Sequence, residues 1–95
     1  MKTNRVIVSQ HPAAVEFIRR ELPEFSEVPV LKTATPDDVR DAVVAGNLPF
    51  SLAALAREVI AIQFAGQPPR GREYGIQEMD AAGAYLARYC VEVLS

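Results

Sequence analysis

The spacing of apolar residues changes several times along the chain, and each change marks a predicted element. Val6, Ile7 and Val8 are consecutive and β-branched, a pattern typical of a short strand buried on both faces. From Pro12 the apolar residues recur at helical spacing, and Pro23 ends that run. Pro12 fits the first turn of a helix, where its missing N–H is not needed. The pattern therefore predicts a strand followed by a helix.

The remaining elements continue this alternation. Thr35 and Pro36 are typical of a helix start, with Thr35 as the cap, and the helix that follows can only be short. Pro29 lies inside the second apolar run and favours an edge strand there. Beyond the first strand, the pattern predicts further strands at 26–32, 41–46 and 58–65, longer helices at 48–56 and 76–90, and a short terminal strand at 91–95.

Strands that alternate with helices predict an α/β fold with a small open, mostly parallel sheet flanked by helices. The 95 residues make one domain, 1–95, because no repeat or linker divides them. A chain of this length buries only about 60–65% of its unfolded surface and is marginal alone. We therefore expect a homodimer, in which the second copy adds stability.

Composition and charge exclude several classes of function. The net charge of −2 lacks the basic excess of a protein that binds duplex nucleic acid. No apolar run reaches the length of a membrane span, and the first residues lack a signal-peptide cleavage site, so we expect a cytoplasmic protein. One histidine and one cysteine do not make a usual zinc site, and no GxGxxG or Walker sequence predicts a nucleotide cofactor. We expect neither a metal nor a cofactor.

The candidate site follows from the fold, because open parallel sheets bind ligands beyond the carboxyl ends of their strands. Three segments reach that edge: SQHP after the first strand, GNLPFS after the third and GQPPRGRE after the fourth. The first two end in helix starts that favour an anion, and the third supplies arginines, which suit phosphate. The candidate residues are Ser9, Gln10, His11, Gly46, Asn47, Leu48, Pro49, Phe50, Ser51, Arg70 and Arg72.

Several of these residues also have a purely structural explanation. His11 can simply cap a helix, Asn47 is an equally good turn residue, and Ser51 stands where serine is often structural. The two arginines can be ordinary solvated loop charges. An apolar stripe in the last predicted helix is expected to be core or dimer contact, and it consists of Ile76, Met79, Gly83, Leu86 and Cys90.

Three stretches, HPAAVEF, GNLPFSLAA and PPRGREYGIQEMDAAGAYL, stand in order at consistent spacing over nearly the whole chain. Together they resemble a family of small CRISPR-associated accessory proteins encoded beside type III systems. The chain departs from that pattern at a few positions. The resemblance implies a glycine at Ala13 or Ala14, a tryptophan at Phe17, a Gly-Asp pair at 40–41 and a threonine at Asn47. Only the last of these positions belongs to the candidate site.

The resemblance implies a minimal, Rossmann-like relative of the CRISPR-associated Rossmann-fold sensor domains, which bind cyclic oligoadenylates across the axis of a homodimer. It further implies a ring nuclease that opens cyclic tetra-adenylate and switches the antiviral response off. In that role we expect metal-independent attack of a ribose 2′-OH on the adjacent phosphate. His11, Asn47 and Arg70 would then be catalytic, with His11 exchanging protons, while Arg72 and the other candidates bind the ligand.

Two other functions fit the same residues. A non-catalytic sponge would bind cyclic oligoadenylate and lower its free concentration without turnover. A protein-interaction accessory would dock on the CRISPR effector complex and bind no nucleotide. A nuclease forms product from the ligand, whereas a sponge does not. Ligand-induced thermal stabilisation is expected for the nuclease and the sponge but not for the protein-interaction accessory.

Overall fold

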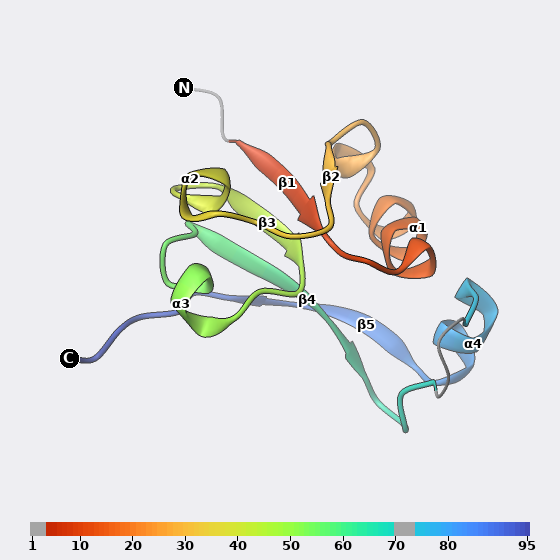
Figure 1. Ribbon diagram of the computed structural model, residues 1–95. Coiled ribbons are helices and arrows are strands. Elements are labelled where there is room, and N and C mark those ends of the chain that lie inside the picture. Colours follow the sequence, from red (N-terminus) through yellow and green to blue (C-terminus); the bar gives the residue numbers. More distant parts are fainter. Residues whose placement is uncertain (1–3, 70–73) are drawn as a thin grey trace.

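The computed structural model describes residues 4–69 and 74–95, and it confirms the alternation of strands and helices (Figure 1). Pro12 stands at the first position of α1, and Thr35 caps α2, both as predicted. In chain order, the elements are β1 (Arg5–Val8), α1 (Pro12–Glu21), the 3₁₀ helix η1 (Pro23–Phe25), β2 (Val30–Leu31), α2 (Pro36–Val39), β3 (Val43–Gly46), α3 (Phe50–Ala53), β4 (Glu58–Phe64), α4 (Ile76–Ala81) and β5 (Ala84–Tyr89).

The strands form one five-stranded sheet in the order β2-β1-β3-β4-β5. The first four strands are parallel, and β5 is antiparallel to β4 along the edge of the sheet. The expected open, mostly parallel sheet is therefore confirmed, and the fold is Rossmann-like. β2 is an edge strand, as Pro29 indicated, but it is only two residues long.

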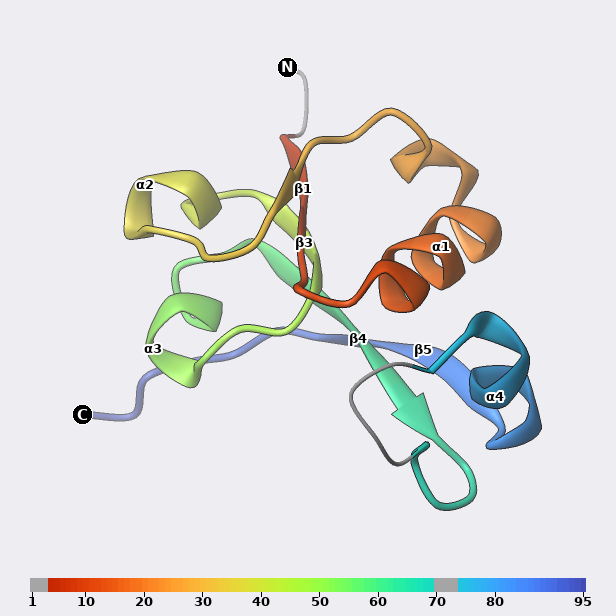
Figure 2. The same cartoon turned by 45° about the vertical axis from the view of Figure 1, so that its right-hand side comes forward.

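Helices cover both faces of the sheet, with α1 and α4 on one side and α2 and α3 on the other (Figures 1 and 2). On the first side, Phe17 of α1 and Met79 of α4 are fully buried together with Ala13. On the second side, Val39 of α2 and Ala53 of α3 pack on valines of the sheet. Because both faces of the sheet are covered, Val6, Ile7 and Val8 of β1 are all buried, which explains the continuous apolar sequence of this strand.

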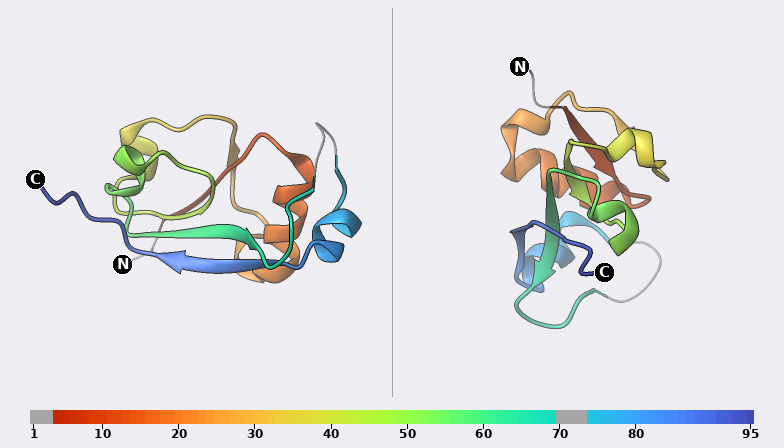
Figure 3. Two further views of the ribbon diagram at one scale, coloured as in Figure 1. Left: turned by 90° about the horizontal axis from the view of Figure 1, so that it is seen from below. Right: turned by 90° about the vertical axis from the view of Figure 1, so that its left-hand side faces the viewer.

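The predicted helix at 76–90 is wrong in its second half. α4 ends at Ala81, and Gly83 adopts a positive φ of 75°, which turns the chain into β5. In β5 the alternation has period two: Ala84 and Leu86 pack against the core of α1 and α4, while Tyr85 and Tyr89 are exposed. The left panel of Figure 3 shows β5 running beside β4 along its length.

Three other boundaries also differ from the prediction. The helix expected at 48–56 is shorter and comprises only α3. It ends early because the N–H groups of Leu55 and Ala56 donate to carbonyl groups three residues earlier, which tightens the chain into a turn. The strand expected at 41–46 begins at Val43, after Asp41 adopts a positive φ of 58°. Residues 91–95 form no strand, and Cys90 is exposed, so the predicted stripe is not one buried helix face.

Candidate functional site

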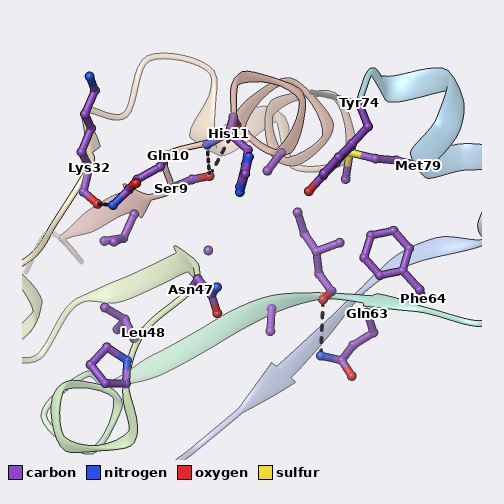
Figure 4. A pocket seen from close by; sticks show the side chains of 16 residues that line it. Ser9, Gln10, His11, Lys32, Asn47, Leu48, Gln63, Phe64, Tyr74 and Met79 are labelled. Carbon is purple, nitrogen blue, oxygen red and sulfur yellow. Dashed lines mark hydrogen bonds between the residues drawn. The ribbon is translucent and has the colours of Figure 1, made fainter. Parts of the chain in front are cut away.

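A cavity of about 710 Å³ opens at the carboxyl ends of β1, β3 and β4 (Figure 4). It exists because β4 is longer than its neighbour. The last paired residues of β3 and β4 are Ala45 and Ile60, so the chain from Ala61 to Phe64 continues past the end of β3. All four residues of that extension line the cavity, opposite the start of α1.

The cavity brings together most of the residues that the sequence predicted. Two of the three expected segments meet there, one after β1 and one after β3, and they lie on adjacent strands of the sheet. The predicted residues that line the cavity are Ser9, Gln10, His11, Gly46, Asn47, Leu48 and Pro49. The cavity therefore lies at the edge of the sheet where the rule for open parallel sheets predicts a ligand site.

Four predicted residues are not part of this lining. Phe50 and Ser51 are exposed on α3, and Phe50 keeps 83% of its surface accessible. α3 packs against the opposite side of the sheet through Ala53, which places its first turn outside the cavity. Arg70 and Arg72 lie outside the described residues, so their roles remain predictions.

The cavity also contains residues that the sequence did not single out. Lys32 follows the carboxyl end of β2, and the same edge rule applied to that strand would have found it. Gln63 and Phe64 belong to the extension of β4, whose length relative to β3 has no local signal. Tyr74 precedes α4 and reaches the cavity because α4 packs on α1, a tertiary contact that the sequence pattern does not encode.

His11 occupies the N-cap position of α1, but its side chain makes no capping hydrogen bond within the described chain. Its backbone N–H instead donates to Ser9 Oγ (3.1 Å), and its carbonyl accepts from the N–H groups of Ala14 and Val15. The imidazole stacks on Tyr74, with ring centroids 5.6 Å apart and planes 29° apart. The ring is therefore exposed to the cavity instead of serving the helix.

The described lining favours an anionic, partly aromatic ligand. It includes Lys32 and His11 but no carboxylate, and the rings of Phe64 and Tyr74 stand beside polar side chains. Figure 4 shows the Asn47 amide at the end of β3, across the open space from His11. Amides and cations bind phosphate oxygens, and aromatic rings stack on bases, so a nucleotide matches this combination.

Two backbone N–H groups beside the cavity are already used by the fold. The Asn47 N–H donates to the Val8 carbonyl (3.0 Å), and the His11 N–H donates to Ser9. These two N–H groups are therefore not free to bind a phosphate in this structure. Gly46 likewise has a structural reason to be glycine, because its φ is +130° and a Cβ there would lie 1.9 Å from the Val8 carbonyl oxygen.

The two helices that carry His11 and Tyr74 are fixed to each other. Arg20 of α1 donates two hydrogen bonds to the Asp80 carboxylate of α4 (2.9 and 2.8 Å). These bonds lower the pKa of Asp80, and the bonds to Asp80 and Glu21 raise the pKa of Arg20. The Arg20 guanidinium also lies over the Phe17 ring, 5.1 Å from its centroid.

Two properties of the described residues bear on other kinds of site. They contain no group of three or more His, Cys, Asp or Glu side chains placed to hold a metal ion. Within the same ranges, 4–69 and 74–95, no helix combines the length and apolarity needed to cross a bilayer.

Comparison with known families gives one match. A family model described as "Putative CRISPR-associated protein (Cas_VVA1548)" matches residues 6–92, which span every described strand and helix except the first residue of β1. Neither the curated proteins nor the solved structures show a significant match to the chain. The matched range includes both cavity segments and α4, and the chain belongs to this CRISPR-associated family.

Proposed function

We propose that the protein is a ring nuclease of type III CRISPR signalling, which binds cyclic tetra-adenylate and opens it. One observation carries this proposal: the imidazole of His11 stands free of the helix cap, in an open cavity whose described lining holds no carboxylate. The volume of about 710 Å³ lies within the usual range of small-molecule sites, roughly 300–1,000 Å³. Membership of a CRISPR-associated family supplies the biological setting.

The proposed reaction is an internal transesterification. The 2′-oxygen of one ribose attacks the adjacent phosphorus, and the bond from phosphorus to the 5′-oxygen of the next nucleotide breaks. The proton of the 2′-OH passes to a base, and a proton goes to the departing 5′-oxygen. The products carry a 2′,3′-cyclic phosphate and a free 5′-OH, so the step consumes no water and needs no oxidant or cofactor.

His11 is the proposed proton-transfer group, because histidine is the side chain that most often serves in general acid–base catalysis. The Asn47 amide, in the same space, would donate to the phosphate oxygens that gain charge during the attack. Arg70 is proposed to share this role and Arg72 to bind the ligand. The Asn47 and His11 N–H groups are already engaged within the fold and do not share in this stabilisation.

A homodimer suits a cyclic ligand made of four identical nucleotides. A two-fold axis presents the same residues twice, and a symmetric ring offers the same groups twice. We propose that two copies of the cavity edge contact one ring, so that each His11 faces one of two equivalent phosphates.

A single-turnover assay tests the proposal. Protein in excess is incubated with cyclic tetra-adenylate in EDTA, and the products are identified by liquid chromatography and mass spectrometry. Linear di- or tetra-adenylate with a 2′,3′-cyclic phosphate is the expected product. Intact ligand retained by the protein indicates a sponge, and intact ligand left free indicates a protein-interaction accessory.

Three variants locate the chemistry. His11→Ala is expected to slow opening by about 10²–10⁴-fold, the usual contribution of a general acid or base. Arg70→Ala and Arg72→Ala are expected to weaken ligand binding. Gln77→Ala, an exposed residue on α4 outside the cavity lining, is the matched control and keeps the parental rate. Parental cleavage by His11→Ala contradicts the role proposed for this histidine.

A further inference from the structure

We propose that Tyr74 is a positioning residue that holds the imidazole of His11 in its reactive orientation. This inference rests on the proposed function, in which His11 transfers a proton. The two rings are stacked, with centroids 5.6 Å apart and planes 29° apart, within the usual range of aromatic pairs. The imidazole makes no hydrogen bond to another described residue, so the stack is the contact that the structure gives this ring.

Tyr74 can hold His11 because its own position is fixed. It packs against the buried cluster of Ala13, Phe17 and Met79, which joins α1 to α4. Immediately after it, the Gly75 N–H donates to Glu78 Oε2 (2.6 Å) and starts α4 at a defined point. Tyr74 is thereby tied to the first turn of α4 on one side and to α1 on the other.

The opposite ends of the two helices are fixed by a second contact. Arg20 and Asp80 form the two-bond ion pair near the carboxyl end of α1, while His11 and Tyr74 stack at its amino end. Met79 is fully buried between these points. Two contacts therefore join α1 to the α4 segment, one near each end of α1, and the His11 imidazole forms part of the contact at the amino end.

Orientation matters because proton transfer needs the imidazole nitrogen within hydrogen-bond reach of the reacting hydroxyl. A misplacement of about 1 Å can cost on the order of 100-fold in rate. Without an aromatic partner, the His11 side chain samples other rotamers, and only a fraction of molecules hold the reactive one. The loss is then in the chemical step, while contacts that bind the ring of nucleotides elsewhere in the cavity are kept.

Tyr74→Leu and Tyr74→Phe separate this role from simple packing. Both keep an apolar side chain against the α1–α4 cluster, but only phenylalanine keeps the stack. Tyr74→Leu is expected to lower the single-turnover rate by about tenfold or more, measured at protein concentrations that saturate the ligand for each variant. Tyr74→Phe is expected to keep that saturating rate near parental. Tyr74→Met repeats the test if Tyr74→Leu does not fold, as judged by circular dichroism.

The chain contains one histidine, which gives a readout independent of activity. In untagged protein, the carbon-bound imidazole protons produce one set of NMR signals, and the Tyr74 ring current shifts them. Tyr74→Leu is expected to remove that shift, and Tyr74→Phe to retain it. If the signals of Tyr74→Leu equal those of the parent, the stack is absent and the inference is overturned.

The outcomes also separate this inference from the proposed function. If the imidazole signals of Tyr74→Leu move but its ring-opening rate equals that of the parent, the positioning role is overturned and the proposed nuclease activity stands. A parent protein that opens no ring overturns the nuclease, and with it the catalytic part of this inference. The NMR comparison then still decides whether Tyr74 holds His11.

Discussion

Gly46 offers a sharp test of why the site has its shape. The glycine at the end of β3 has a φ of +130°, and a methyl group there would lie 1.9 Å from the carbonyl oxygen of Val8 in β1. That carbonyl also accepts the Asn47 N–H at 3.0 Å. Gly46→Ala must therefore change the backbone of β3 or push β1 away, at the point where two cavity segments meet.

The expected cost combines two effects. A non-glycine residue in a sparsely populated backbone region costs about 1–3 kcal/mol. Weakening the hydrogen bond from Asn47 to Val8 adds about 0.5–1.5 kcal/mol. Gly46→Ala should thus lose roughly 2–4 kcal/mol of the free energy of unfolding, a large part of the total of about 5–15 kcal/mol expected for such a domain. In a chain of this size that lowers the melting midpoint by roughly 10–30 °C.

Urea unfolding followed by circular dichroism measures this loss directly. Gly66→Ala is the control, because Gly66 has no positive φ and its Cβ would lie 3.3 Å from the Ala82 carbonyl oxygen. We expect the control to change the free energy of unfolding by less than about 1 kcal/mol. If Gly46→Ala unfolds within about 0.5 kcal/mol of the parent but loses ligand binding, glycine is required for approach of a ligand and the structural explanation is refuted.

Three further changes test the ion pair between α1 and α4, the cap of α2 and the packing between α1 and α4. Because Arg20 lowers the pKa of Asp80, this pair stabilises the fold above the ordinary carboxyl pKa of 3.8, and the stabilisation is lost as the pH falls from that value through the lowered pKa. Asp80→Asn should therefore make the free energy of unfolding depend less on pH when it is measured between pH 6 and 3. Thr35→Ala removes the cap of α2 and should cost about 1 kcal/mol in urea unfolding, with Thr35→Ser near parental. Phe17→Trp, the residue that the resemblance implies there, should overpack the α1–α4 cluster by about 1–3 kcal/mol. Adding Ala13→Gly should recover at least about 0.5 kcal/mol relative to the sum of the two single changes, and additive values would show that the two positions are not coupled.

Over the first two thirds of the chain, local signals in the sequence were enough to predict the type and order of the elements, although several of their boundaries differ. The β-branched run at Val6–Val8 and the prolines at 12 and 36 act within one turn or one strand, so they predict β1, α1 and α2 without knowledge of their neighbours. The last segment is different. Ile76, Met79 and later apolar residues fit a helical period across the turn at Gly83, while the alternation of β5 becomes visible only once β4 is its partner.

The site shows the same division. The rule that ligands bind at the carboxyl edge of the sheet places Ser9, His11 and Asn47 together, because each follows a parallel strand whose end can be recognised from the local sequence. Phe50 also follows β3, but it does not line the cavity, because the orientation of α3 depends on its packing through Ala53. Tyr74 could not be predicted, since its position results from contact between helices at opposite ends of the chain.

The misassigned β5 and the missed cavity residues have one physical cause. The cavity is the space beside the part of β4 that runs past β3, and a strand without a neighbour on either side leaves its backbone groups unpaired. β5 pairs with that whole extension, from Ala61 opposite Ala87 to Phe64 opposite Ala84. A helix at 84–90 would have left the extension unsupported and the cavity without one of its walls. The antiparallel strand at the edge, which the sequence pattern concealed, is therefore what allows β4 to extend and the site to exist.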